Sequence, residues 1–126
     1  MIRTHSLGVP HRVAFSNGGQ TAHADVPADK GGAGDGFGPH DLLEAALATC
    51  MAITVEKTAA AHAIPLESVE VRVRLDRADP DAVGLIYSLE FRGALDAEQR
   101  GTLERAASRC PVQRTLTGRL TCRAEG

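Results

Sequence analysis

The sequence of 126 residues predicts an α+β fold with antiparallel sheets, a long central helix and a second helix. Three observations lead to this class. An apolar helical pattern runs from about Gly38 to Ala61, two alternating strands follow between Val69 and Arg92, and a capped helix begins near Asp96. The chain therefore runs in the order strands, helix, strands, helix and strand.

The N-terminal part is expected to form an antiparallel hairpin. Residues 11–16 and 20–26 flank Asn17-Gly18-Gly19, and glycine supplies the backbone conformation that a tight hairpin turn needs. The segment from Pro27 to Gly38 is rich in glycine and turn-forming residues. We predict a flexible loop of about a dozen residues there, a length at which loops are often functional.

The central helix is predicted to begin at Gly38 or Pro39, because proline is tolerated at the first helical position. Asp41 would face the positive end of the helix dipole. Residues at helical spacing give the helix one shared apolar face, formed by Leu43, Leu47, Cys50 and Thr54. Residues 42–55 carry a single charge, at Glu44, so both sides of the helix are expected to contact protein.

Two strands with one apolar and one charged face follow the helix. Apolar and polar side chains alternate over residues 69–76 and again over residues 85–92. The turn between them is supplied by Asp79-Pro80-Asp81. This alternation is typical of an antiparallel sheet that is covered on one side.

The C-terminal part is expected to hold a second helix and a short final strand. Asp96 is a plausible N-cap with Gln99 three residues later, and the helical spacing continues to Cys110. Residues 116–123 alternate again, which predicts the strand and assigns Cys122 to its apolar, core-facing side.

Length and charge place the chain among ordinary single domains, residues 1–126. It has 14 basic and 16 acidic residues and no basic block, which argues against nucleic-acid binding. No apolar run approaches the ~20 residues that span a bilayer, and no signal-peptide pattern is visible. We therefore expect a cytoplasmic protein, without membrane partners, whose disulfides would be transient and catalytic.

The cysteines are the main candidates for chemistry. Cys50 lies in an apolar helical run, where a cysteine is most often a small buried hydrophobe. A reactive thiolate needs a nearby cation, donor or dipole, which the neighbours Thr49 and Met51 do not supply. Candidate cations from elsewhere in the chain are Arg12, Arg109 and Arg114. Arginines in the last turn of a helix, as near Cys110, are also commonly solvated charges that complement the dipole.

Metal and nucleotide chemistry find little support. No Cys-x-x-Cys or His-x-x-x-His spacing occurs, so we expect no metal site. The glycine pairs Gly18-Gly19 and Gly31-Gly32 lack the strand and lysine context of a phosphate-binding loop. The sequence predicts no bound cofactor.

Four segments in a fixed order carry a resemblance that covers most of the chain. They are Asp25-Val26-Pro27 with Gly31-Gly32, then Gly38-Pro39 through Cys50, then Leu95 to Arg100, and finally Cys110 to Leu116. In these segments the sequence resembles the OsmC-like family, which includes the organic hydroperoxide resistance proteins. The resemblance implies an intertwined homodimer in which the long helix carries Cys50 and the second cysteine approaches from the other helix.

The resemblance also implies a thiol-dependent peroxidase that acts on organic hydroperoxides in oxidative stress defence. Cys50 would become a sulfenic acid, Cys110 would condense with it to a disulfide, and an external dithiol would reduce the pair. In some family members this dithiol is a protein-bound lipoyl group. We expect an apolar pocket beside Leu43, Leu47 and Met51, because each buried CH₂ of a substrate contributes about 0.8 kcal/mol.

Three positions depart from the family pattern. The glutamate ten residues before the first cysteine is His40 here, the Gly-Gly-Arg turn ends in Gln20, and the histidine of the second cysteine motif is Gln113. The candidate activating groups or pocket residues are Arg12, His40, Asp41, Arg109 and Arg114. Two other functions stay open: a dimeric protein that binds a hydrophobic small molecule, and a thiol redox sensor without sustained turnover.

Overall fold

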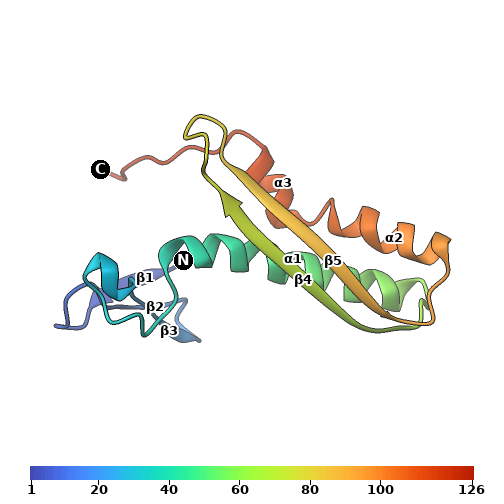
Figure 1. The fold of residues 1–126 in the computed structure, drawn as a ribbon, viewed down its shortest axis with the longest axis horizontal. Coiled ribbons are helices and arrows are strands. Elements are labelled where there is room, and N and C mark those ends of the chain that lie inside the picture. The colour runs from blue at the N-terminus through green and yellow to red at the C-terminus, as the bar shows by residue number, and fades with distance from the viewer. The chain divides into compact units, whose positions relative to one another are not determined.

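The computed structural model describes all 126 residues, which divide into two compact units, Met1–Leu43 and Glu44–Gly126 (Figure 1). Three α-helices and two small antiparallel sheets confirm the predicted α+β class. None of the helices combines the length and the apolar character needed to cross a membrane.

The first unit is an antiparallel meander followed by a short 3-10 helix. Its strands are β1 (Arg3–Ser6), β2 (Val13–Ser16) and β3 (Thr21–Ala24), paired in that order, and η1 covers Ala28–Lys30. The predicted hairpin is confirmed as β2 and β3. Its turn is held by the Asn17 side chain, whose oxygen accepts the backbone N–H groups of Gly19 and Gln20 at 2.9 and 2.8 Å.

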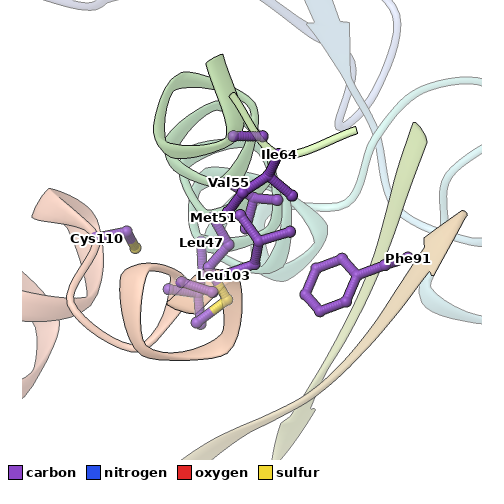
Figure 2. Packing of buried hydrophobic residues seen from close by; sticks show 9 residues of the cluster. Leu47, Met51, Val55, Ile64, Phe91, Leu103 and Cys110 are labelled. Atoms are coloured by element: carbon purple, nitrogen blue, oxygen red, sulfur yellow. The ribbon is translucent and has the colours of Figure 1, made fainter. Parts of the chain in front are cut away.

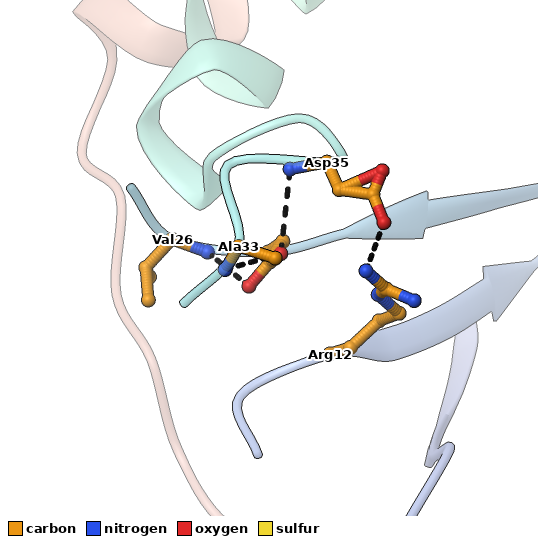
Figure 3. A network of polar contacts seen from close by, with 5 residues as sticks. Arg12, Val26, Ala33 and Asp35 are labelled. Atoms are coloured by element: carbon orange, nitrogen blue, oxygen red, sulfur yellow. Dashed lines mark hydrogen bonds and ion pairs between the residues drawn. The ribbon is translucent and has the colours of Figure 1, made fainter. Parts of the chain in front are cut away.

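The segment predicted as a flexible loop is folded around a buried carboxylate (Figure 3). One oxygen of Asp25 accepts the N–H of Val26 at 2.7 Å, and the other accepts those of Ala33 and Asp35 at 3.1 and 3.3 Å. Arg12 forms an ion pair with Asp35 beside this network. The Val26 N–H, followed by the other two amides and the Arg12 charge, lowers the pKa of Asp25 against the opposing effect of burial.

The glycine at position 32 is required by the same network. A Cβ there would lie 2.0 Å from the carbonyl oxygen of Val26 and 2.4 Å from a carboxylate oxygen of Asp25. Glycine is therefore the residue that allows the backbone to approach the carboxylate this closely.

Helix α1 runs over Pro39–Ala61, as the sequence predicted. Its buried stripe has a spacing of four and consists of Leu47, Met51, Val55 and Ala59. The predicted shared face was wrong, because Leu43 is 44% exposed and Cys50 lies on the flank of this stripe. Within the chain, α1 is buried on one side only, and Ile53 on another side is 52% exposed.

Strands β4 (Leu66–Asp76) and β5 (Gly84–Gly93) form a two-stranded antiparallel ribbon and confirm the predicted alternation. Cross-strand pairs such as Val71 with Leu89 face the core, while the other face carries charged side chains. The Glu44 carboxylate, at the start of this unit, accepts the backbone N–H of Leu75 at 2.6 Å. This bond ties α1 to the end of β4.

Helix α2 (Ala97–Ala107) begins with the predicted capping box, in which Asp96 and Gln99 satisfy each other's backbone N–H groups. Its Leu103 is fully buried in the core that α1, α2 and the ribbon share (Figure 2). The members of this core are Leu47, Met51, Val55, Ala59, Ile64, Phe91, Leu103, Ala107 and Cys110.

The C-terminal predictions need two corrections. The second helix ends at Ala107 rather than at Cys110, whose backbone is extended because Pro111 disfavours a helical conformation in the residue before it. The predicted final strand is wrong, since Pro111–Thr117 forms a third helix, α3, with proline at its first position. Residues 118–126 have no regular structure, and Cys122 is exposed rather than buried.

Candidate functional site

Two sulfur atoms meet at the start of α3. Cys50 Sγ, from α1, accepts the backbone N–H of Val112 at 3.4 Å, and Cys110 Sγ accepts that of Gln113 at the same distance. Pro111 has no N–H, so these two amides are the first donors that the helix can offer. The Cys-Pro sequence thereby brings both thiols to one point, although they are 60 positions apart.

The two thiols lie in different environments. Cys110 is fully buried, whereas Cys50 is half-buried, and neither is in a disulfide. Burial raises the pKa of Cys110, the Gln113 N–H opposes this, and the adjacent Cys50 side chain raises the pKa further by accepting its proton in a hydrogen bond. Cys110 is therefore a neutral thiol at neutral pH, placed beside the sulfur of Cys50.

A surface groove of about 420 Å³ opens over Cys50. Its walls come from α1 and the start of α3 and consist of Ala46, Thr49, Cys50, Ile53, Thr54, Lys57, Pro111 and Val112. The Thr49 hydroxyl donates its proton to the carbonyl of Ala45 within the helix, at 2.6 Å, so that proton is already in a hydrogen bond. The groove thus combines one thiol, mostly apolar walls and a single charged group, Lys57.

The predicted pocket residues lie elsewhere. Leu47 and Met51 are buried in the core and do not line the groove, while Leu43 belongs to the first unit. The exposed side chains of Arg109 and Arg114 form no ion pair and are not groove residues either. The structure therefore brings together the two predicted cysteines but none of these five neighbours.

The remaining candidate site residues belong to the first unit, and each is either bonded to another residue or exposed. Arg12 is paired with Asp35, and the Asp41 carboxylate accepts the Gly38 N–H at 2.8 Å at the start of α1. His40 is exposed. No group of three or more His, Cys, Asp or Glu side chains is arranged to hold a metal ion.

Sequence reasoning missed Ile53, Lys57 and the backbone donors of α3. The first two lie three and seven residues after Cys50, so the helical repeat itself could have found them. The donors could have been found from proline at the first helical position, had a helix rather than a strand been expected after Cys110.

Three solved structures illustrate what the fold is similar to. A putative osmotic stress induced and detoxification response protein from Psychrobacter arcticus has 26% identity and a TM-score of 0.76, over 90% of this chain and 85% of that one. An OsmC-like protein from Mycoplasma pneumoniae has 22% identity and a TM-score of 0.74, over 94% and 86%. The organic hydroperoxide resistance protein OhrB of Bacillus subtilis has 22% identity and a TM-score of 0.66, over 94% and 90%.

Residues 32–125 match the family model described as OsmC-like protein. The matched region includes both cysteines of the site and every residue of the groove. The chain belongs to the OsmC-like family. A comparison with curated protein sequences gave no match.

Proposed function

We propose that this protein is a thiol-dependent peroxidase that reduces organic hydroperoxides with Cys50 and Cys110. The observation that carries the proposal is the pairing of a half-buried thiol at a groove with a fully buried neutral thiol beside it. A peroxidase of this type needs one sulfur that reacts with the substrate and a second sulfur that reacts only after the first has been oxidised. Family membership supports the same role.

In the first step the Cys50 thiolate attacks the terminal oxygen of the hydroperoxide. A sulfur–oxygen bond forms, the oxygen–oxygen bond breaks, and the alkoxide leaves and takes a proton to become the alcohol. Cys50 is oxidised to a sulfenic acid. The Val112 N–H, at 3.4 Å, is the donor that we assign to the Cys50 sulfur during this attack.

In the second step Cys110 attacks the sulfenic sulfur. The disulfide forms, and hydroxide leaves with the Cys110 proton as water. An external dithiol, such as a lipoyl protein, then reduces the disulfide by exchange and is itself oxidised. This cycle suits a compartment that keeps thiols reduced, and we propose the cytoplasm as the location.

We also propose that the active form is a homodimer. The support lies in the family resemblance and in large apolar side chains left exposed by the second unit, among them Ile53 at 52% and Ile86 at 46%. Sedimentation equilibrium at micromolar concentration should give twice the chain mass. A monomer at that concentration would contradict the dimer and leave the thiol chemistry to be judged separately.

The decisive experiment treats the fully reduced protein with one equivalent of cumene hydroperoxide without oxygen, followed by disulfide mapping. A rapid Cys50–Cys110 disulfide is expected, reversible by a dithiol. Cys50→Ser and Cys110→Ser should abolish it. Cys122→Ser is the matched control and should behave as the unaltered chain, because that thiol is exposed and lies outside the groove.

Two outcomes would contradict the proposal. Unchanged thiols after prolonged exposure would remove the peroxidase chemistry and favour a binding role for the groove. A disulfide that forms once but supports no turnover with excess dithiol would favour a redox sensor.

A further inference from the structure

We propose that residues 105–124, the basic segment, bind an acidic protein surface that presents the reducing dithiol to the sulfur pair. The inference rests on the proposed function, because it concerns the reductive half of that cycle. It gives a role to Arg109 and Arg114, which form no ion pair in the chain and do not line the groove. The two arginines would recognise the dithiol protein rather than activate Cys50.

The basic segment carries charge of one sign only. It holds five of the 14 basic residues of the chain and none of the 16 acidic residues. Its basic residues, spaced four or five positions apart, are Arg105, Arg109, Arg114, Arg119 and Arg123. All five are exposed, and the ion pairs of the chain use other arginines, at positions 12, 72, 74 and 92. Their charge is therefore not neutralised within the chain.

Two of these charges lie next to the sulfur pair. Arg109 directly precedes Cys110, and Arg114 belongs to α3, whose first turn donates to both sulfurs. Val112 and Leu116 pack against the core. Arg114 is two residues from each of them, which places it on the opposite, solvent side of the helix. An incoming thiol at the start of α3 therefore approaches beside two exposed guanidinium groups.

The reduction itself requires this approach. A thiolate of the dithiol protein attacks the Cys50 sulfur, because Cys50 is half-buried whereas Cys110 is fully buried. The bond between Cys50 and Cys110 breaks, and Cys110 leaves as a thiolate that takes up a proton. The second thiolate of the dithiol protein then attacks that protein's own sulfur in the mixed disulfide. This releases Cys50 as a thiolate and leaves the dithiol protein oxidised to a disulfide.

The charges select an acidic surface as the partner. Guanidinium groups form bidentate pairs with carboxylates, and complementary charge accelerates the association of two proteins. A two-fold dimer places a surface against the same surface of the second copy, where charges of one sign would repel each other. The homodimer contact is assigned to apolar side chains such as Ile53 and Ile86, so the basic segment stays free for a different protein.

The test measures reduction of the Cys50–Cys110 disulfide by two synthetic peptides that carry the same dihydrolipoyl-lysine. Four glutamates flank the dithiol in one peptide and four glutamines in the other. Each rate is divided by that of the same peptide with neutral 2-hydroxyethyl disulfide, which corrects for a difference in thiol reactivity. The acidic peptide should be about tenfold faster at low salt, the lower end of what electrostatic steering provides. High salt should remove most of this preference.

Two double variants locate the effect. Arg109→Gln with Arg114→Gln should lower the preference to about threefold by slowing only the acidic peptide, as expected for the loss of two exposed charge contacts. Arg3→Gln with Arg100→Gln is the matched control, because it removes two exposed arginines that form no ion pair and lie outside the basic segment. Equal rates for both peptides in the unaltered protein, or an equal loss of preference in the control, would overturn the inference.

The disulfide for this test is formed with diamide, so the measurement does not depend on peroxidase activity. A preference for the acidic peptide in a protein that does not reduce cumene hydroperoxide would retain the docking role and reject the peroxidase. Peroxidase activity without the preference would do the reverse. Failure of diamide to join the two thiols would overturn both. Tighter binding of a short DNA oligonucleotide than of the acidic peptide at physiological salt would overturn the acidic protein partner in favour of a nucleic acid.

Discussion

The two units of the chain are stabilised in opposite ways. In Met1–Leu43 the buried side chains are those of Ala14, Ala24 and the charged Asp25, whose carboxylate accepts three backbone N–H groups. In Glu44–Gly126 the buried side chains form one apolar cluster that includes the thiol of Cys110. One unit is thus organised by a satisfied charge and the other by hydrophobic burial.

The same comparison distinguishes a polar group that stabilises the fold from groups that can react. Asp25 has three donors and an adjacent ion pair, and the backbone at Gly32 is packed against it with no room for a side chain. Each sulfur at the start of α3 has one backbone donor at 3.4 Å, and Cys50 faces a groove. A fully satisfied group holds a loop, whereas an accessible, weakly satisfied thiol can react.

The largest expected effect is in the apolar unit. Leu103→Ala should lower its free energy of unfolding by about 3 kcal/mol, because a fully buried leucine leaves a cavity in a packed core. Urea unfolding followed by circular dichroism would measure it. Leu120→Ala, at a side chain that is 61% exposed, should change the value by less than about 0.5 kcal/mol. Similar values for both variants would contradict the assignment of the core.

The next effect is in the polar unit. Gly32→Ala should cost about 2 kcal/mol, because the new Cβ would overlap the Val26 carbonyl oxygen and the Asp25 carboxylate. Faster hydrogen exchange at the amides of Ala33 and Asp35 would report the local loss. Gly19→Ala is the control, since its nearest atom would be 3.7 Å away. Unchanged exchange in Gly32→Ala would mean that the loop does not depend on this close approach.

The carboxylate network should weaken in acid. The pKa of Asp25 is lowered in the folded state, chiefly by the Val26 N–H, so the unfolded chain binds more protons below the ordinary value of 3.8. Its stabilising effect is present above that pH and is lost as the pH falls through the folded-state pKa. Amide exchange at Ala33 should therefore accelerate in acid, and Asp25→Asn should remove most of that pH dependence. Equal pH dependence in the two proteins would contradict the network.

The thiol pair should show a smaller effect in the opposite direction. The pKa of Cys110 is raised above its ordinary value of 9.0, chiefly by burial, so the unfolded chain loses its proton first as the pH rises. The stability is present below that pH and declines as the pH rises toward the folded-state pKa. Thermal melts of the reduced protein should show a shallower alkaline decline in Cys110→Ala than in the unaltered chain. A steeper or equal decline would argue against a buried neutral thiol.

Several elements could be predicted because their signals are local. The bounds of α1, the β2–β3 and β4–β5 hairpins and the capping box of α2 all follow from periodicity, turn residues and capping residues. The prediction of a final strand was wrong because it rested on the short alternating pattern at residues 116–123 and not on Pro111, which begins a helix. The prediction of the buried face of α1 was wrong because the helix is largely apolar, and two different stripes of residues fit the helical spacing about equally well.

The sequence by itself determined the central helix, the two hairpins and the capped second helix, together with the family resemblance and the identity of the two candidate thiols. Only the tertiary structure decided that Cys50 borders a groove while Cys110 is buried, that Val112 and Gln113 donate to the two sulfurs, and which side of α1 packs. The physical reason is the distance along the chain over which each effect acts. Periodicity and capping act over a few residues, whereas burial and the contact between two thiols 60 positions apart depend on which surfaces of the folded chain meet.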